Sequence, residues 1–384
     1  RLLLVRFLVP SIRPDWDATE LARNRARASV NPQKGEILRG ERIVTAGDRV
    51  TDEQIERMRA YQTELERLGA LSGERGARTL GAFLFNLITL SLIGALLYFY
   101  RPNVYGEFRH VTLIGALVLA VLGAAAIIVA GGAHVALIPV AFPALVVATL
   151  WDGRLALTLS LTLAILLTGQ AELTGITTLL TLAAGGAVAS LSVRVVRRRA
   201  EIWSFIAFIA AGYAVVAIVL GLLRSWDFNE VLWAAAWGAV TAVASAFMAQ
   251  GFLPVFEGFT RITTDQSLLE LADVNRPLLR RLSMEAPGTY AHSVNVANLA
   301  EVAAGAIGAN ALLTRVGVYY HDVGKMLRPH LYIENQHGGR NPHDRLKPAT
   351  SAAQIRSHVL EGVKLAEEHR LPDVVKAFIT EHHG

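Results

Sequence analysis

Val316-Gly-Val-Tyr-Tyr-His-Asp-Val-Gly-Lys325 is the stretch from which the rest of the sequence is best interpreted. At its centre lies the dipeptide His321-Asp322, and nine of the eleven histidines fall between position 292 and the C-terminus. Imidazole is the commonest metal-ligating side chain, and an adjacent carboxylate can bridge two ions. The pattern therefore predicts a two-metal hydrolytic site built from His292, His321, Asp322, His358, His382 and His383.

Hydrophobic periodicity places these residues on helices. We expect His292 in the first turn of one helix, His321-Asp322 at the end of a second and His358 at the start of a third. The pair His382-His383 ends the last helix, and Gly324 allows the chain to turn close to a ligand. Nitrogen and oxygen donors without sulfur favour iron or manganese over zinc or nickel.

The remaining histidines of this region are weaker candidates, because a single histidine is more often a surface or core residue than a ligand. His369 is expected on a solvated helix face. His330, His337 and His343 lie in or near a loop at 337–348 that is rich in Gly, Pro and Asn, and this loop could cover the site.

Composition indicates a membrane protein. Of 384 residues, 53% are hydrophobic and only 18% are charged, which is too apolar for an ordinary soluble chain. The net charge of +5 is interpreted as a topology signal, and we expect neither DNA nor RNA as a partner. The absence of cysteine excludes disulfides, thiolate catalysis and cysteine-based zinc sites.

Seven apolar runs predict a seven-helix transmembrane bundle within residues 80–253. Pro139 and Pro143 predict a kink or a re-entrant segment in the third run, so counts of six or eight spans are alternatives. The runs cover residues 80–100, 111–131, 134–151, 155–169, 175–193, 202–223 and 230–253.

Loop charge predicts the orientation. With seven spans, arginines concentrate in the loops at 101–110, 151–154 and 194–201, whereas the opposite loops contain only Arg224. The excess of positive charge favours the cytoplasmic side. Residues 1–79 are then extracytoplasmic and residues 254–384 cytoplasmic. Because the spans hold almost no charged side chains, we expect an anchor and relay instead of a transporter.

The segments on either side of the bundle differ in character. In residues 1–79 we expect an α+β module, with two short strands within 36–44 and a helix that begins with a capping box from Thr51 to Gln54. Leucines recur between charged residues at 257–283, which predicts amphipathic helices that link the bundle to the C-terminal domain.

Several motifs carry a family resemblance. His292, His321-Asp322 and His358 match the pattern of HD-domain phosphohydrolases, and His382-His383 adds the two-metal variant. Further segments make the chain similar to the seven-transmembrane HD proteins of bacteria, the PgpH-type cyclic-di-AMP phosphodiesterases. These segments are Leu253-Pro-Val-Phe-Glu257, Leu269-Glu-Leu-Ala-Asp-Val-Asn275, Ala286-Pro-Gly-Thr-Tyr-Ala-His-Ser293, Ile333-Glu-Asn-Gln336, Asn341-Pro-His-Asp344 and Glu381-His-His-Gly384.

The resemblance implies a polytopic α-helical membrane protein of the bacterial inner membrane with an all-α cytoplasmic HD domain at 254–384. It also implies hydrolysis of cyclic-di-AMP to a linear dinucleotide by a hydroxide that two divalent metals activate. Asp322 would bridge the ions, with His292 and His321 on one and His358, His382 and His383 on the other. Lys325 would neutralise charge on the phosphoryl group.

The same resemblance implies a further Asp ligand well downstream of the histidine pair, beyond the last residue of this chain, so that the HD domain is expected to be cut short. Two alternatives stay open: a cyclic-di-GMP phosphodiesterase, and a membrane receptor that binds a nucleotide without hydrolysing it. An unknown extracytoplasmic ligand and a homo-oligomer are further expectations.

Overall fold

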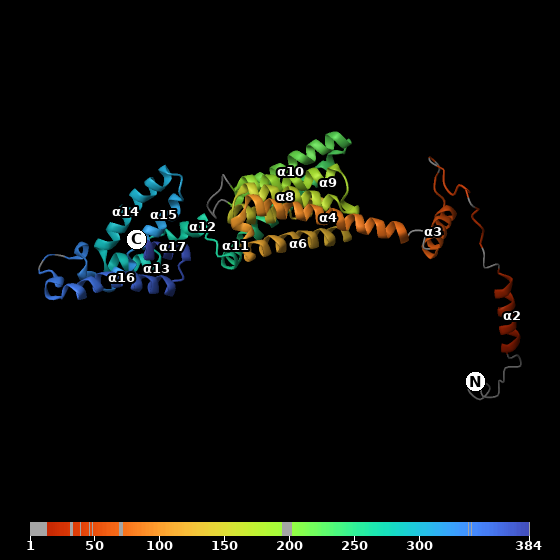
Figure 1. Ribbon diagram of the computed structural model, residues 1–384. Coiled ribbons are helices and arrows are strands. Elements are labelled where there is room, and N and C mark those ends of the chain that lie inside the picture. The colour runs from red at the N-terminus through yellow and green to blue at the C-terminus, as the bar shows by residue number, and fades with distance from the viewer. Residues whose placement is uncertain are drawn as a thin grey trace, which may run out of the picture. The chain divides into compact units, whose positions relative to one another are not determined.

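The computed structural model describes residues 14–30, 34–38, 40–45, 47, 49–68, 72–193, 202–336, 338 and 340–383, and every regular element among them is a helix (Figure 1). The chain divides into two compact units, Arg1–Gly81 and Ala82–Gly384. The second unit contains both the apolar bundle and the C-terminal helical domain.

The first unit contains the helices α2 (Trp16–Ser29) and α3 (Asp52–Arg67) and the beginning of a third helix at Ser72. The expected capping box is confirmed: the Thr51 backbone N–H donates to Gln54 Oε1 over 2.9 Å, and the Gln54 N–H donates to Thr51 Oγ1 over 3.4 Å. The expected strands are not found, because residues 36–38 and 40–44 are irregular. Two short strands need a third strand or a packed face, and the described residues of this unit supply neither.

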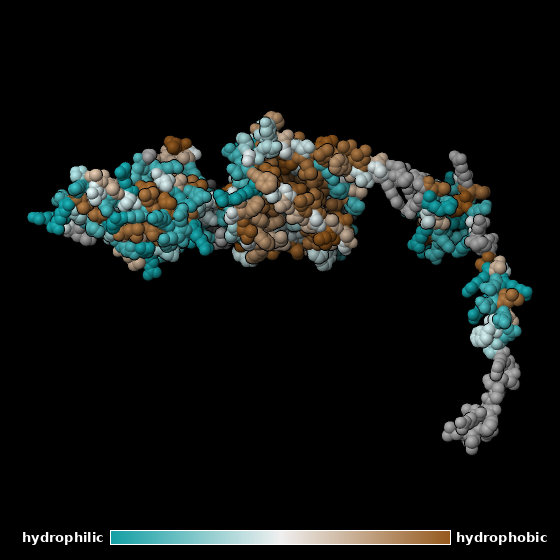
Figure 2. Space-filling model, turned by 60° about the horizontal axis from the view of Figure 1, so that its bottom comes forward, coloured by the Kyte–Doolittle hydropathy of each residue, from teal (hydrophilic) through white to brown (hydrophobic). Residues whose placement is uncertain are grey.

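Four helices are long and apolar enough to cross a membrane, and three shorter apolar helices accompany them. Side chains with high hydropathy cover the visible surface of this bundle (Figure 2). The long helices are α4 (Ser72–Tyr100), α6 (Phe108–Ala130), α10 (Ile202–Arg224) and α11 (Phe228–Thr260), and the shorter ones are α7 (Ala141–Leu150), α8 (Gly153–Thr168) and α9 (Ile176–Ser192). Short helical turns lie between them at α5 (Pro102–Tyr105), η1 (Val135–Leu137) and η2 (Ala171–Leu173).

The two prolines of the third apolar run break it, as expected. Pro139 separates η1 from α7, and Pro143 lies in the first turn of α7. Nearly every residue of α7 is buried, so this short helix lies inside the bundle. Small residues let its neighbours pack closely: a Cβ at Gly185 would lie 2.2 Å from the hydroxyl of Tyr213.

The C-terminal helical domain follows α11 and is all-helical in its described residues, as the sequence predicts. Its core is formed by leucines of α12 and α13 together with side chains of α15, α16 and α17. The elements are α12 (Asp265–Leu271), α13 (Pro277–Glu285), α14 (Pro287–Ala306), α15 (Ala311–Tyr320), η4 (Val323–Leu327), η5 (Pro329–Leu331), η6 (Ile333–Asn335), η7 (Pro342–Arg345), α16 (Pro348–Glu368) and α17 (Asp373–Glu381).

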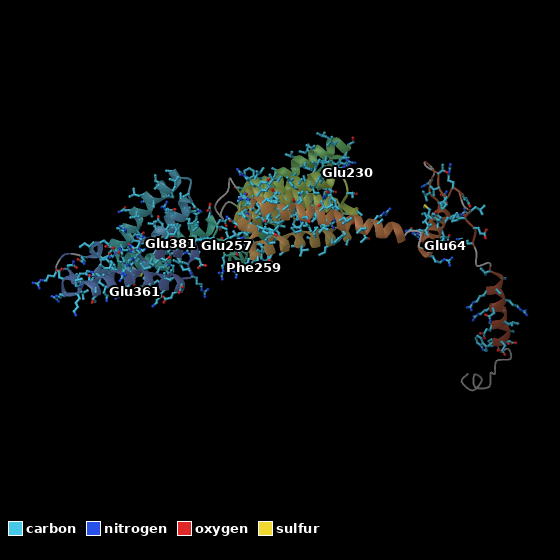
Figure 3. The ribbon with its side chains drawn as sticks, viewed as in Figure 1. Glu64, Glu230, Glu257, Phe259, Glu361 and Glu381 are labelled. Carbon is cyan, nitrogen blue, oxygen red and sulfur yellow. The ribbon has the colours of Figure 1, made fainter. Side chains whose placement is uncertain are left out.

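Helix α12 connects the end of α11 to the core of this domain. The carboxylate of Glu257, labelled in Figure 3, accepts hydrogen bonds from the Thr264 N–H and from the Ser267 hydroxyl, over 3.2 and 2.9 Å. At the other end of α12, the Tyr320 hydroxyl donates to the Leu271 carbonyl over 2.8 Å. The linker leucines therefore pack as amphipathic helices, as expected.

Candidate metal centre

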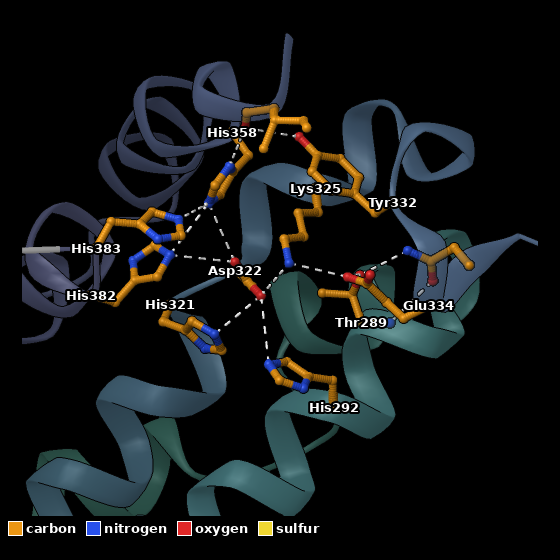
Figure 4. A network of polar contacts seen from close by, with 12 residues as sticks. Thr289, His292, His321, Asp322, Lys325, Tyr332, Glu334, His358, His382 and His383 are labelled. Atoms are coloured by element: carbon orange, nitrogen blue, oxygen red, sulfur yellow. Dashed lines mark hydrogen bonds and ion pairs between the residues drawn. The ribbon is translucent and has the colours of Figure 1, made fainter. Parts of the chain in front are cut away.

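The histidines singled out in the sequence converge on Asp322 from four helices (Figure 4). His321 and Asp322 follow the last residue of α15, and His382 caps the end of α17, as predicted. Two placements differ in detail. His292 lies one turn inside α14, which already begins at Pro287. His358 lies in the middle of α16, because Pro348 at the first helical position starts that helix ten residues earlier.

A backbone contact between η4 and α16 brings Asp322 close to His358. A Cβ at Gly324 would lie 1.9 Å from the His358 carbonyl oxygen and 2.6 Å from the Gly362 nitrogen. Gly324 does not have positive φ, and what the structure requires of it is the lack of a side chain at this close approach. A larger residue at position 324 would separate the two halves of the site.

The two carboxylate oxygens of Asp322 face different histidines. Oδ2 lies 3.1 Å from His321 Nε2 and 4.0 Å from His292 Nε2. Oδ1 lies 3.4 Å from His358 Nε2 and 3.6 Å from His382 Nε2. One carboxylate thus connects two groups of imidazoles, as a bridging ligand does.

Each group has ligand atoms that lie within 4.8 Å of one another: His292, His321 and Asp322 form the first, and His358, His382 and His383 the second. Asp322 is 2% exposed, and its Oδ1 has no hydrogen-bond partner. An unpartnered buried carboxylate oxygen surrounded by imidazole nitrogens is costly unless a cation or donor completes it. The donor set therefore fits divalent metal ions.

Hydrogen bonds to backbone carbonyls orient three of the imidazoles. Because a carbonyl oxygen only accepts, a proton lies on Nδ1 and Nε2 is the ring nitrogen that faces the centre. The Nδ1 atoms of His321, His358 and His382 donate to Val318 O, Ile355 O and Ile379 O over 2.7, 2.5 and 3.0 Å. The Nε2 nitrogens of His382 and His383 lie 3.3 and 3.2 Å from that of His358.

The surroundings of Asp322, His358 and His382 favour the ligating form of each. Burial alone would raise the pKa of Asp322, but hydrogen bonds and positive charge from His321 and Lys325 lower it overall. Burial lowers the pKa of His358 and also that of His382, whose neighbouring imidazoles lower it further. An ionised carboxylate and neutral imidazoles are the forms that bind metals.

Lys325 has a partner that the sequence did not reveal. Its ammonium lies 2.8 Å from Asp322 Oδ2, and Glu334 Oε1 lies 3.1 Å away on the other side. Glu334 lies within the segment 333–336, for which the sequence predicted no role. The sequence feature that could have identified Glu334 is an acidic residue next to an amide residue in a turn-rich loop. Only the fold shows that this side chain contacts Lys325.

Among the residues that the structure describes, the other histidines of this region do not join the two groups. Both ring nitrogens of His343 already have hydrogen-bond partners. Nδ1 lies 2.6 Å from the Ser351 hydroxyl, and Nε2 lies 2.8 Å from the Leu331 carbonyl oxygen. His330 is exposed and His369 is exposed at the end of α16, as expected for the latter. His337 lies outside the described residues.

Models of known protein families match three successive parts of the chain. Three family models match it: "7TM-HD extracellular" at residues 1–63, "7TM receptor with intracellular HD hydrolase" at 77–264, and "HD domain" at 289–384.

Two curated relatives carry the name cyclic-di-AMP phosphodiesterase PgpH. The protein of Listeria monocytogenes is 32% identical over 98% of this chain and 52% of its own length. The protein of Bacillus subtilis is 46% identical over 38% of this chain and 21% of its own length. The chain thus spans about half the length of the first relative.

A solved structure, the PgpH HD domain of L. monocytogenes in complex with cyclic-di-AMP, is 51% identical over 29% of this chain and 52% of that chain, with a TM-score of 0.29. With four apolar helices of spanning length and the matched models, this chain is a membrane protein with an HD hydrolase domain. It belongs to the family of seven-transmembrane proteins that carry an intracellular HD domain.

Proposed function

We propose that this protein is a membrane-bound phosphodiesterase that hydrolyses cyclic-di-AMP to a linear dinucleotide. The observation that carries the proposal is the division of the Asp322 oxygens between two groups of imidazoles, which is the arrangement of a two-metal phosphoesterase. The substrate is proposed from the names of two relatives, one 32% identical over 98% of this chain and the other 46% identical over 38% of it.

Two divalent ions, iron or manganese by their donors, fit the two groups. His292 and His321 would hold one, His358, His382 and His383 the other, and Asp322 would bridge both. When bound, such ions supply an acidified water as nucleophile and charge that stabilises the phosphate oxygens. The backbone hydrogen bonds of His321, His358 and His382 orient these three rings in advance, so they need little reorganisation on loading.

The ammonium of Lys325 has a role of its own in this proposal, separate from that of the metal ions. An ammonium has three N–H donors, and Lys325 uses two of them on Asp322 and Glu334. The third is available to a non-bridging oxygen of the substrate phosphate, where it would stabilise the charge of the transition state. We therefore assign Lys325, with Asp322, to the catalytic residues.

The proposed topology has seven spans, which are the four long helices together with the three shorter apolar ones. The extracytoplasmic domain then covers residues 1–79, the bundle 80–253 and the cytoplasmic HD domain 254–384, all in the bacterial inner membrane. The arginine-rich loops support this orientation. Reporter fusions after residues 79 and 262 would test it, and the same side of the membrane for both would exclude an odd number of spans.

The decisive assay uses the full chain in detergent with manganese, incubated separately with cyclic-di-AMP and cyclic-di-GMP, followed by mass analysis of the products. We expect a linear dinucleotide from cyclic-di-AMP, and no product from Asp322→Ala. Preferential turnover of cyclic-di-GMP would favour that alternative substrate. Nucleotide binding without turnover at any metal loading would instead favour a receptor and refute the hydrolase.

A further inference from the structure

Two segments that carry the family resemblance, Ala286–Ser293 and Ile333–Gln336, contain residues that the metal ligands do not explain. In the structure these segments meet: η6 lies against the first turn of α14. A Cβ at Gly288 would lie 1.8 Å from the Glu334 carbonyl oxygen and 2.9 Å from Asn335 Oδ1. Only glycine at this position lets the two backbones approach so closely.

At this contact lies a series of hydrogen bonds in which the donor and the acceptor of each bond can be assigned. The Thr289 N–H donates to Asn335 Oδ1 over 3.1 Å, so the amide nitrogen of Asn335 faces the Thr289 hydroxyl and donates to it over 2.8 Å. The hydroxyl proton then donates to Glu334 Oε1 over 3.1 Å. Glu334 is thus the terminal acceptor of the series, since a carboxylate has no proton of its own to donate.

The same oxygen of Glu334 also accepts from the Lys325 ammonium over 3.1 Å, as the dashed lines in Figure 4 show. Thr289 is fully buried, whereas the side chains of Lys325 and Glu334 are 16% and 24% exposed. The series of hydrogen bonds therefore connects the buried Thr289 to the ammonium of Lys325 at the edge of the site. The Tyr332 ring, whose centroid lies 5.1 Å from Lys325 Nζ, covers this cation from another side.

We propose that Gly288, Thr289, Glu334 and Asn335 form a positioning device, the Lys325 clamp, which holds the Lys325 ammonium between Asp322 and the substrate phosphate. Without the clamp, Lys325 has only Asp322 to pair with, and its long side chain regains rotamers that direct its N–H groups elsewhere. This inference rests on the proposed function for the role of Lys325, but the position of its ammonium is testable without turnover.

The first test measures the reactivity of Lys325 in the full chain, in detergent and with metal removed by chelation. A limiting amine-reactive acetyl ester is added, and peptide mass spectrometry gives acetylation of Lys325 relative to the exposed Lys364. Glu334→Ala should raise this ratio about tenfold, because a charge-assisted hydrogen bond is lost, and Glu334→Gln should restore most of the protection. An unchanged ratio in Glu334→Ala overturns the proposal.

A second pair of variants covers the case in which Glu334→Ala does not fold. Thr289→Val removes the hydroxyl with little change of volume, and Thr289→Ser keeps it. The valine variant should raise Lys325 acetylation and the serine variant should not; equal ratios count against the clamp. Gln336→Ala is the matched control, because Gln336 lies in the same segment but donates to the His330 carbonyl instead.

The third test separates positioning from general stability by a double-mutant cycle on turnover. Glu334→Ala should lower kcat between about tenfold and about 100-fold with little change in KM, since a misplaced group costs transition-state stabilisation. In a Lys325→Met background the same substitution should change kcat by less than about twofold. A full loss in both backgrounds would show that Glu334 does not act through Lys325. If the wild type hydrolyses no cyclic dinucleotide, the proposed function fails, while the acetylation ratio still decides on the clamp.

Discussion

Replacing Gly324 by alanine tests whether backbone contact sets the spacing of the metal site. The new Cβ would lie 1.9 Å from the His358 carbonyl oxygen, and ordinary van der Waals contact begins at 3.4 Å. Both clashing atoms are backbone, so η4 and α16 must separate by about 1.5 Å, the difference of these two distances. Metal–ligand distances tolerate only about 0.2 Å, so Asp322 and His358 can no longer share a bridged pair of ions.

We expect Gly324→Ala to purify with at most one ion per chain, against the two proposed for the wild type, and to lose at least about 100-fold in turnover. Overpacking should also lower the free energy of unfolding by about 1–3 kcal/mol. Elemental analysis, hydrolysis of cyclic-di-AMP and thermal unfolding measure the three effects on one preparation.

Gly305→Ala is the control, because Gly305 lies in α14 and its nearest neighbour to a new Cβ is Ala311 Cβ at 4.0 Å. This variant should keep its metal and its turnover, and it should gain up to about 1 kcal/mol of stability from the better helix former. Wild-type metal content and turnover in Gly324→Ala would refute the claim that the η4–α16 contact fixes the site.

Three further predictions concern the histidines. His321→Ala should abolish hydrolysis but leave membrane insertion intact, because the side chain contacts the site and not the bundle; loss of the protein from the membrane fraction would contradict this. His343→Ala should lower the free energy of unfolding by about 1–3 kcal/mol, since Ser351 and Leu331 lose their partner, yet leave the metal content unchanged. Burial lowers the pKa values of His358 and His382 below the ordinary 6.5, so the unfolded state binds more protons below that pH. The unfolding midpoint of chelated protein should therefore fall as the pH drops from about 7.5 to about 5.5, and a rising midpoint would reverse the sign argued here.

The identities of the candidate ligands were predictable, because imidazoles and a carboxylate gathered in one helical domain favour a metal site over isolated surface positions. Their division between the two carboxylate oxygens was not derivable from the residues, since it depends on where α16 crosses η4. The position of His358 shows the limit. Val359, Val363 and Leu365 gave the helical period but not its start, and Pro348 set a start ten residues earlier.

The fold was predictable where one physical effect dominates. Long apolar runs predicted the bundle, and Pro139 and Pro143 predicted the break between η1 and α7. The prediction of two strands within 36–44 was wrong because β-propensity acts only through a partner strand, which local sequence does not supply. Glu334 was missed for a similar reason: its partner Lys325 lies nine positions away, across the short helical turns η4, η5 and η6.

Helix α12 has mechanical consequences for the domain that follows it. At one end it is tied to Glu257 of α11, and at the other the Leu271 carbonyl accepts from Tyr320, the residue directly before His321. Seven helical residues span only about 10 Å and do not stretch, so this element acts as a short rigid rod. If the end of α11 moves along the axis of α11, one of these two hydrogen-bonded contacts must break, or Tyr320, the residue next to His321 and Asp322, must move with it.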